Sequence, residues 1–221
     1  MDIRKSPAIF LGVVMLAVSG CSSSADDNNR TTLQKAQDLG RVEINKYQGQ
    51  RLTDFEKLRD NSIQGPQKID TAKYRLIIDG LVSVKQELSY RQVLGMERYQ
   101  KLLILHCVEG WSARGLFEGV LVEDILKLAV VKPGANTLIF HAADGYTSSL
   151  PLKTVRDKKL LLAHRINNQT LTVRSGFPFQ LIAEDQLGYK WVKWLKRIQV
   201  SNDSTYRGFW ESRGYDNKAD Y

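Results

Sequence analysis

Cysteine is the scarcest residue type that carries chemistry in this sequence, with only Cys21 and Cys107 among 221 residues. Cys21 closes an apolar run near the start, so an exported domain would contain Cys107 alone and no internal disulfide to stabilise it. A single thiol in an oxidising compartment is a liability unless it is buried or bound to something. Cys107 is therefore either a buried structural residue, which is the commoner role of a free cysteine, or a ligand.

Histidine is also rare, and His106, His141 and His164 are too far apart in the sequence to resemble a metal-ligand motif. The sequence contains no G-x-S-x-G motif and no glycine-rich phosphate loop, so neither of these enzyme classes is supported. The formal net charge is +8, but no long run of Lys or Arg accompanies it, and nucleic-acid binding is not expected. The excess charge suits an anionic headgroup, cofactor or substrate, and a surface protein that binds polyanions is a weaker alternative.

The first twenty residues have the layout of a secretory signal. A short basic pair, Arg4-Lys5, precedes an apolar run from Ala8 to Val18, which is too short for a membrane-spanning helix. Small residues then lead to Cys21, whose thiol is expected to carry a lipid; a plain cleaved signal with an incidental cysteine is the alternative. We therefore expect an exported lipoprotein, anchored to a membrane and facing the periplasm or the cell exterior.

The sequence divides into three parts by composition. Residues 1–20 are the expected signal peptide, and residues 21–70 are polar, as in a lipid-anchored tether with a peripheral helical segment. Helix-compatible stretches occur there at 32–38 and 52–60. Residues 71–221 are long enough to bury a core and are expected to form one domain.

From Tyr74 onward the sequence predicts many short strands and two or three short helices, which is an α+β pattern. The apolar run that ends at Cys107 predicts a strand buried on both faces. Apolar spacing over Leu121–Val130 predicts an amphipathic helix, and Ser89 is expected to cap a short helix that runs to Leu94. The strands are expected at 74–78, 81–88, 101–107, 137–141, 146–152, 160–166, 171–173, 179–183 and 191–200.

Two segments contain residues suited to binding. Cys107 lies where a strand ends and a glycine-containing loop begins, and a thiolate is a soft ligand for a transition metal. In a regular strand over 191–200, Lys190 and Lys193 would lie on opposite faces, so one of them could neutralise a phosphate. The alternative is an edge strand whose lysines discourage aggregation.

Several blocks, taken in order, resemble the molybdopterin-binding oxidoreductase domain, the family of sulfite oxidase and of the periplasmic methionine-sulfoxide reductase catalytic subunit. The resemblance covers about residues 74–200. The matching blocks are Ile78-Asp79-Gly80-Leu81, Cys107-Val108-Glu109-Gly110-Trp111-Ser112, Gly119-Val120-Leu121, Asp144-Gly145-Tyr146, Gly176-Phe177-Pro178 and Gly188-Tyr189-Lys190-Trp191-Val192-Lys193-Trp194.

The resemblance implies a mixed, β-rich α+β fold of the sulfite-oxidase type that holds molybdopterin with molybdenum. It implies that Cys107 is the thiolate ligand of the metal and the catalytic residue. It further implies two-electron oxygen-atom transfer on a small oxyanion or sulfoxide, with an electron-transfer partner such as a cytochrome. The positions that map to cofactor binding are Ser175, Gln180, Lys190, Trp191, Val192 and Lys193.

Some of these positions differ from the family pattern and keep a second interpretation open. Ser175 stands where relatives have Asn or His, and Gln180 stands where they have Arg, whose planar charged fork suits a phosphate. Arg4-Lys5 is not the twin-arginine pair expected of a protein that is exported with its cofactor already bound. The alternative is a binding or scaffold lipoprotein that retains the fold without the cofactor.

Overall fold

The computed structural model describes residues 44–221, which group as one unit. The predicted signal, the lipid site Cys21 and the helical stretch at 32–38 lie outside the described residues. The described chain begins with a small hairpin of β1 (Lys46–Tyr47) and β2 (Gln50–Arg51). A helix-compatible stretch was predicted over 52–60, but only one 3-10 turn, η1 (Phe55–Lys57), forms there, and it ends at Leu58.

The first large sheet is antiparallel, with the order β10-β9-β6-β5, and β11 also pairs with β9. The long hairpin of β5 and β6, at one edge of this sheet, carries Cys107 at its turn. The strands are β5 (Tyr99–His106), β6 (Ser112–Leu121), β9 (Leu161–Ile166), β10 (Gln169–Thr170) and β11 (Gln180–Ile182).

The second large sheet is mixed, with the order β4-β3-β12-β7-β8. Strand β12 pairs in parallel with β3 and antiparallel with β7, so the last strand of the chain lies at the centre of the sheet. The strands are β3 (Arg75–Gly80), β4 (Gln86–Ser89), β7 (Thr137–Ala142), β8 (Thr147–Pro151) and β12 (Leu195–Ser201).

Short helices connect the strands, as predicted. Helix α2 (Tyr90–Leu94) starts at a capping box in which the Ser89 side chain accepts from the Gln92 amide. Helix α3 (Val122–Ala129) has one buried face, as its apolar spacing predicts. The remaining helical pieces are α4 (Leu152–Asp157), η2 (Gly188–Lys190) and η3 (Glu211–Arg213).

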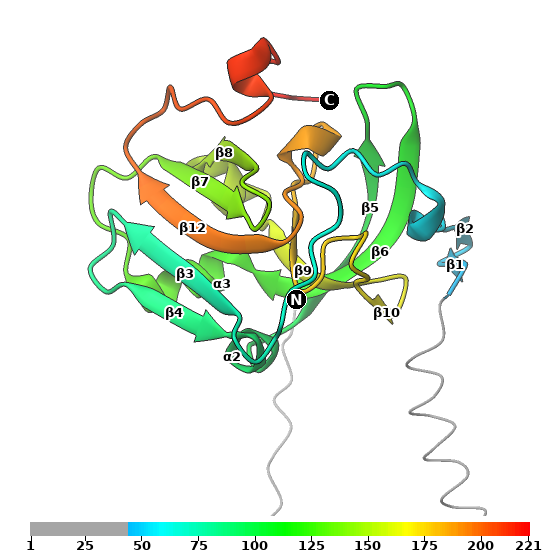
Figure 1. Cartoon of the computed structure of the whole chain (residues 1–221), viewed down its shortest axis with the longest axis horizontal. Coiled ribbons are helices and arrows are strands. Elements are labelled where there is room, and N and C mark those ends of the chain that lie inside the picture. The colour runs from blue at the N-terminus through cyan, green and yellow to red at the C-terminus, as the bar shows by residue number, and fades with distance from the viewer. Residues whose placement is uncertain (1–43) are drawn as a thin grey trace, which may run out of the picture. The chain divides into compact units, whose positions relative to one another are not determined.

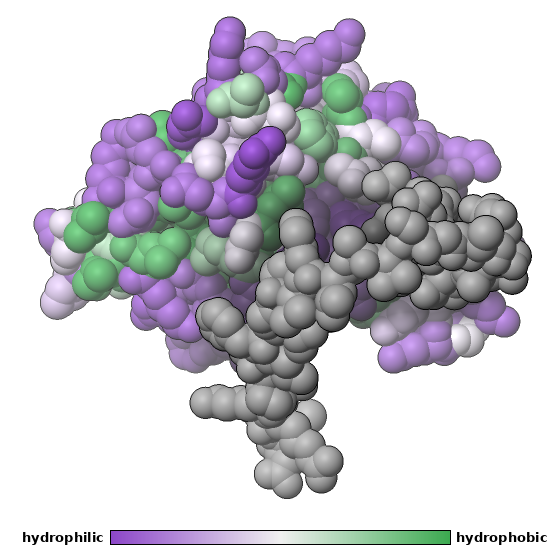
Figure 2. Space-filling view, turned by 90° about the horizontal axis from the view of Figure 1, so that it is seen from below, coloured by the Kyte–Doolittle hydropathy of each residue, from purple (hydrophilic) through white to green (hydrophobic). Residues whose placement is uncertain are grey.

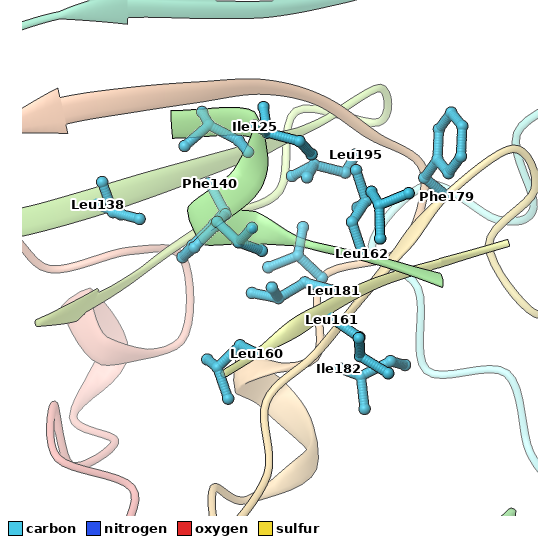
Figure 3. Packing of buried hydrophobic residues seen from close by; sticks show 14 of the residues in the cluster. Ile125, Leu138, Phe140, Leu160, Leu161, Leu162, Phe179, Leu181, Ile182 and Leu195 are labelled. Atoms are coloured by element: carbon cyan, nitrogen blue, oxygen red, sulfur yellow. The ribbon is translucent and has the colours of Figure 1, made fainter. Parts of the chain in front are cut away.

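The core lies where the two sheets and α3 meet (Figures 1 and 3). Strand β7 contributes Phe140, β12 contributes Leu195, and α3 contributes Ile125, all completely buried. From the other sheet, the β9 and β11 side chains Leu162 and Leu181 point into the same cluster. One continuous core therefore joins the sheets, and the β-rich α+β fold class is confirmed.

Three sequence expectations about strands are wrong in detail. Strand β5 is an edge strand with half-exposed side chains, and Ile104 is 37% exposed, so it is not buried on both faces. The strand expected at 171–173 is replaced by β10, two residues earlier, directly after the Asn167-Asn168 turn. The strand expected from Trp191 starts only at Leu195, because Trp194 has a left-handed backbone conformation with φ of 50°.

The face seen in Figure 2 is mainly hydrophilic, with hydrophobic residues gathered toward its left side. Among the large apolar residues that the structure leaves exposed are Val84, Leu128 and Val130, which backbone hydrogen bonds between 83–84 and 129–130 bring near one another. Across residues 44–221, no helix combines the length and the apolar character that a bilayer crossing requires.

Candidate active site

Cys107 occupies the turn between β5 and β6; the sequence predicts a strand that ends here and a loop that follows it, but it did not predict β6. Its amide donates to the Trp111 carbonyl at 2.9 Å, and its own carbonyl accepts from Gly110 at 3.0 Å. Gly110 adopts φ of 86°, a conformation that glycine reaches without a Cβ penalty. This tight loop turns the half-buried thiol away from the strand, so the sulfur is presented at the end of the sheet.

The thiol opens onto a cavity of about 480 Å³, a volume within the usual range for small-molecule sites. Its walls come from both sheets, from the loop after η1 and from the C-terminal residues. Aromatic side chains supply much of the lining, namely Trp111, Tyr146, Tyr189, Trp191, Trp194, Trp210 and Tyr215.

Lys193 lies on the same cavity, in an irregular stretch rather than in a strand. Gly176 makes this possible, because a Cβ at that position would come within 3.1 Å of the Lys193 side chain. The Gly176 carbonyl also accepts from the Trp194 amide at 3.3 Å. The two sequence blocks around Gly176 and Lys193 therefore pack directly against each other.

The turn η2 brings the other end of this stretch to the thiol. A Cβ on Gly188 would lie 3.4 Å from Leu105 and 3.9 Å from the Cys107 Cα. Trp191 follows and lines the cavity, with its indole N–H donating to the Gln186 carbonyl at 3.0 Å. The structure thus brings Cys107 to the same cavity as Trp191 and Lys193, which lie far from it in the sequence.

Lys190 does not line the cavity, which corrects its predicted place in the cofactor site. Its side chain is completely buried, and its Nζ lies 2.6 Å from Oε1 of the equally buried Glu211. The ammonium also donates to the Ser149 carbonyl at 3.0 Å. The physical reason is the buried carboxylate of Glu211, a residue remote in the sequence, which together with the Ser149 carbonyl binds the ammonium away from the cavity.

Of the remaining predicted cofactor positions, one lines the cavity and two do not. Gln180, at the start of β11, is buried and lines the cavity. Ser175 does not line it, because its hydroxyl accepts from the Thr172 amide at 2.7 Å and its amide donates to the Thr172 hydroxyl at 3.2 Å. The Val192 side chain is packed in the hydrophobic core and does not line the cavity, so its predicted place in the cofactor site is wrong.

Electrostatics at the cavity favour the protonated thiol in the absence of a metal. Burial raises the pKa of Cys107, and the negative charge of Glu109 acts in the same direction, with the Glu109 Oε2 at 3.9 Å from the sulfur. The pKa of Glu109 is lowered chiefly by the Trp111 indole, which donates to it at 2.9 Å, and next by Asn61. A metal cation bound to the sulfur would instead favour the deprotonated thiolate of Cys107.

The cations on the cavity are each paired with a carboxylate. Burial lowers the pKa of Lys193, and Asp60, at 3.4 Å from its ammonium, opposes that effect. Arg59 lies 3.7 Å from Glu109. Asp144 also lines the cavity, so carboxylates outnumber cations among its charged residues.

Sequence reasoning missed one wall entirely. Residues 59–63, assigned to the peripheral segment at 21–70, line the cavity and supply Arg59 and Asp60. Leu52 is buried and the Thr53 amide donates to the Arg114 carbonyl at 2.8 Å, so this segment belongs to the domain. The available signal was the charged and polar run at 59–62, which sits just before the Gly65-Pro66 turn.

Comparison with known proteins agrees with this geometry. Residues 63–210 match the oxidoreductase molybdopterin binding domain family. The match covers well over half of the chain, and the protein belongs to this family.

Two relatives and one solved structure illustrate the similarity. The chain is 35% identical over 169 residues to the uncharacterized oxidoreductase YuiH of Bacillus subtilis, covering 76% of this chain and 84% of that one. It is 34% identical over 148 residues to the putative protein-methionine-sulfoxide reductase subunit YedZ1 of Azospira oryzae, covering 67% of this chain and 56% of the relative. The sulfane dehydrogenase SoxCD of Paracoccus pantotrophus shares the fold, with a TM-score of 0.61 and 24% identity, over 64% of this chain and 41% of that one.

The cofactor of this family is molybdopterin with molybdenum, and the cavity residues fit it. Cys107 offers a soft sulfur ligand, and Lys193 offers a cation on the same cavity for the anionic end of the pterin. Across residues 44–221, no three His, Cys, Asp or Glu side chains are grouped so that they could hold a metal ion themselves. A donor set of one thiolate suits a metal that brings its other ligands with its cofactor.

Proposed function

We propose that this protein is a membrane-tethered, molybdopterin-dependent oxidoreductase that carries out two-electron oxygen-atom transfer on a small sulfoxide. The observation that carries the proposal is the shared cavity of the Cys107 thiol and the Lys193 ammonium. Cys107 would hold the metal, and Lys193 would neutralise the cofactor phosphate. The bound molybdopterin supplies the oxygen-atom and electron-transfer chemistry, and the protein supplies ligand, charge and shape.

The charge of the cavity favours a neutral sulfoxide over a small oxyanion. With Lys193 committed to the anionic cofactor, the other cation of the lining, Arg59, is paired with Glu109, and the carboxylates Asp60 and Asp144 would repel an oxyanion. The aromatic lining instead offers ring faces and edges, which make favourable contacts with sulfur groups. Reduction would take two electrons and two protons, break the S–O bond, and release a sulfide and water.

The similarity to the putative protein-methionine-sulfoxide reductase subunit supports the same substrate class. The chain spans 56% of that relative, so the proposal of a sulfoxide substrate rests on the charge and lining of the cavity. The reducing electrons would come from an external carrier, such as a cytochrome. Each protein side chain named above would bind, orient or exclude water, and none needs to store electrons.

The proposal places the domain outside the cytoplasmic membrane, tethered through a lipid on Cys21 and facing the periplasm or the cell exterior. The short basic region, the apolar run and the small residues before Cys21 support this placement. Metabolic labelling with a fatty-acid analogue tests it. We expect label on the full chain and none on Cys21→Ser, while equal labelling of both would overturn the anchor.

Turnover tests the chemistry directly. The protein purified from its native envelope is given a reduced viologen dye as electron donor and is offered dimethyl sulfoxide, methionine sulfoxide or nitrate. In a separate assay, it is offered sulfite with ferricyanide as electron acceptor. We expect dye oxidation with the sulfoxides and little activity with the two oxyanions. Preference for an oxyanion would overturn the substrate class, and a molybdenum-free protein without turnover would favour the cofactor-free binding or scaffold role.

A further inference from the structure

The C-terminal residues 206–221, called the strap below, leave β12 and cross the ends of the second sheet toward the first (Figure 1, orange to red). At the start, the strap is bonded to β8. The Phe209 amide donates to the Thr147 carbonyl at 2.9 Å, and the Ser149 hydroxyl donates to the Tyr206 carbonyl at 3.2 Å. Gly208 permits this approach, because a Cβ there would meet the Thr147 carbonyl oxygen at 2.3 Å.

A buried ion pair fixes the middle of the strap. Glu211 Oε1 lies 2.6 Å from the Lys190 ammonium and accepts from the Ser148 hydroxyl at 2.5 Å. Both charged side chains have no exposed surface. Removing one member would leave the other charge buried without its partner, which is a severe cost at such a site. The pair therefore ties the strap to η2 and to β8 together.

The far end of the strap lies beside the thiol loop, which is the turn at 107–111 between β5 and β6. The Leu187 amide donates to the Ala219 carbonyl at 2.9 Å, and the Tyr221 amide donates to the Asp185 carbonyl at 3.2 Å. The Tyr221 ring stacks on His106, the residue before Cys107, with centroids 3.4 Å apart. The strap thus joins β8, η2 and the end of β5, which are the elements around the cavity.

Between these attachments the strap places two aromatic rings on the cavity, Trp210 and Tyr215. Their centroids are 5.1 Å apart, and the Tyr215 ring also meets the Tyr189 ring edge-on at 5.2 Å. The Tyr189 hydroxyl donates to the Asp216 carbonyl at 2.7 Å. Ring contacts and hydrogen bonds together hold this aromatic pair against the lining residue Tyr189.

We propose that Trp210 and Tyr215 are the size-selecting wall of the substrate cavity, and that the Lys190–Glu211 pair is the positioning device that fixes this wall. Residues 211–221 lie beyond the family match at 63–210, so the role of the strap is inferred from its own contacts. The substrate part of the inference rests on the proposed function. The wall would hold back large groups while small sulfoxides pass to the site at Cys107.

Access to the thiol tests the wall without any turnover. The full chain is prepared free of cofactor and with Cys21→Ser, so that Cys107 is its one thiol. It is alkylated with iodoacetamide and with a bulky fluorescent maleimide, and the ratio of the two rates is compared among variants. We expect Trp210→Ala and Tyr215→Ala to raise the relative rate of the bulky reagent about tenfold. An unchanged ratio in both variants would overturn the wall.

Glu211→Ala and Glu211→Gln test the positioning pair. Amide hydrogen exchange is followed at two positions. The Ser212 amide donates to the Gly208 carbonyl inside the strap, and the Leu187 amide donates to the Ala219 carbonyl of the strap. We expect about tenfold faster exchange in Glu211→Ala, with Glu211→Gln between it and the unchanged chain, because Gln keeps hydrogen bonding but not the charge. Lys196→Met, on an exposed lysine, is the control. Unchanged exchange in a folded Glu211→Ala would overturn the positioning role.

Kinetics of the holoenzyme then connect the wall to substrate size. With methyl phenyl sulfoxide and dimethyl sulfoxide as probes, Trp210→Ala should change the ratio of their two KM values about fivefold or more, whereas Lys196→Met, on an exposed lysine outside the cavity, should leave that ratio and kcat unchanged. A merely structural role would shift both KM values together. Absence of sulfoxide turnover in the unchanged enzyme would contradict the proposed function, whereas the alkylation and exchange results judge the strap independently.

Discussion

The Cys107 sulfur and the Lys193 ammonium line one cavity, although the first lies at a turn of the antiparallel sheet and the second lies just before the central strand of the mixed sheet. The packing of Gly188 against Cys107 and of Gly176 against Lys193 sets this relationship. A soft ligand and a cation at one cavity are what a metal carried by an anionic pterin requires.

Lys193→Met should weaken cofactor retention, because the apolar side chain removes the cation that lines the cavity with the thiol. We expect purified Lys193→Met to hold several-fold less molybdenum per chain, on the order of a 1–3 kcal/mol loss for a charged hydrogen bond. Elemental analysis measures this. Lys196→Met is the matched control, since Lys196 is exposed on the neighbouring strand. Equal molybdenum contents in the two variants would contradict the role of Lys193.

Glu118 should contribute stability that depends on pH. Hydrogen bonding from His164, followed by contacts with Gln100 and Arg165, lowers the pKa of Glu118 to about 2 in the folded chain. The unfolded chain keeps the ordinary value near 4.5, so the carboxylate stabilises the fold above that pH and this contribution is lost as the pH falls to about 2.

Glu118→Gln should therefore be less stable than the unchanged chain by about 2 kcal/mol at pH 7, and the difference should shrink toward zero near pH 2. Urea unfolding at several pH values measures the free energy of unfolding. Glu87→Gln, which removes an exposed ion pair with Lys85, is the control and should leave this free energy nearly unchanged at every pH. A Glu118→Gln difference that grows with acidification would contradict this account.

Gly80 should tolerate no side chain. It adopts φ of 86°, and a Cβ there would lie 2.1 Å from the backbone oxygen of Val200, on the parallel partner strand β12. We expect Gly80→Ala to destabilise the fold by about 3 kcal/mol or more, from strain and strand separation together.

Gly134→Ala is the matched control for that substitution, because Gly134 has φ of 84° and nothing within 4 Å of a built Cβ. It should lose about 1 kcal/mol from the backbone conformation alone. Thermal or urea unfolding compares the two variants. Similar losses would show that the close approach to Val200 carries no extra cost.

Local sequence patterns predicted the elements that local interactions determine. The hairpin around Asp144-Gly145 forms β7 and β8, and the spacing over Leu121–Val130 yields α3. The thiol was identified because it is scarce and ends a strand. These features depend on residues close together in the chain, which is why single-sequence reasoning reaches them.

Features set by distant contacts were not predicted. Trp194 leaves the strand pattern because its indole donates to the Val173 carbonyl at 2.7 Å and its amide donates to Gly176. The burial of Lys190 depends on Glu211, and the wall at 59–63 depends on packing beside the thiol loop. No periodicity or motif in the sequence encodes these pairings, since their partners come from remote segments.

Molybdenum bound through Cys107 is the central claim, and one measurement tests it most directly. Elemental analysis and absorption spectroscopy are applied to the protein and to Cys107→Ser, both purified from the native envelope. We predict about one molybdenum per chain with thiolate-to-metal absorption in the unchanged protein, and loss of that absorption in Cys107→Ser with the fold retained. Less than about a tenth of a molybdenum per chain in the unchanged protein, or identical spectra for both, would contradict it.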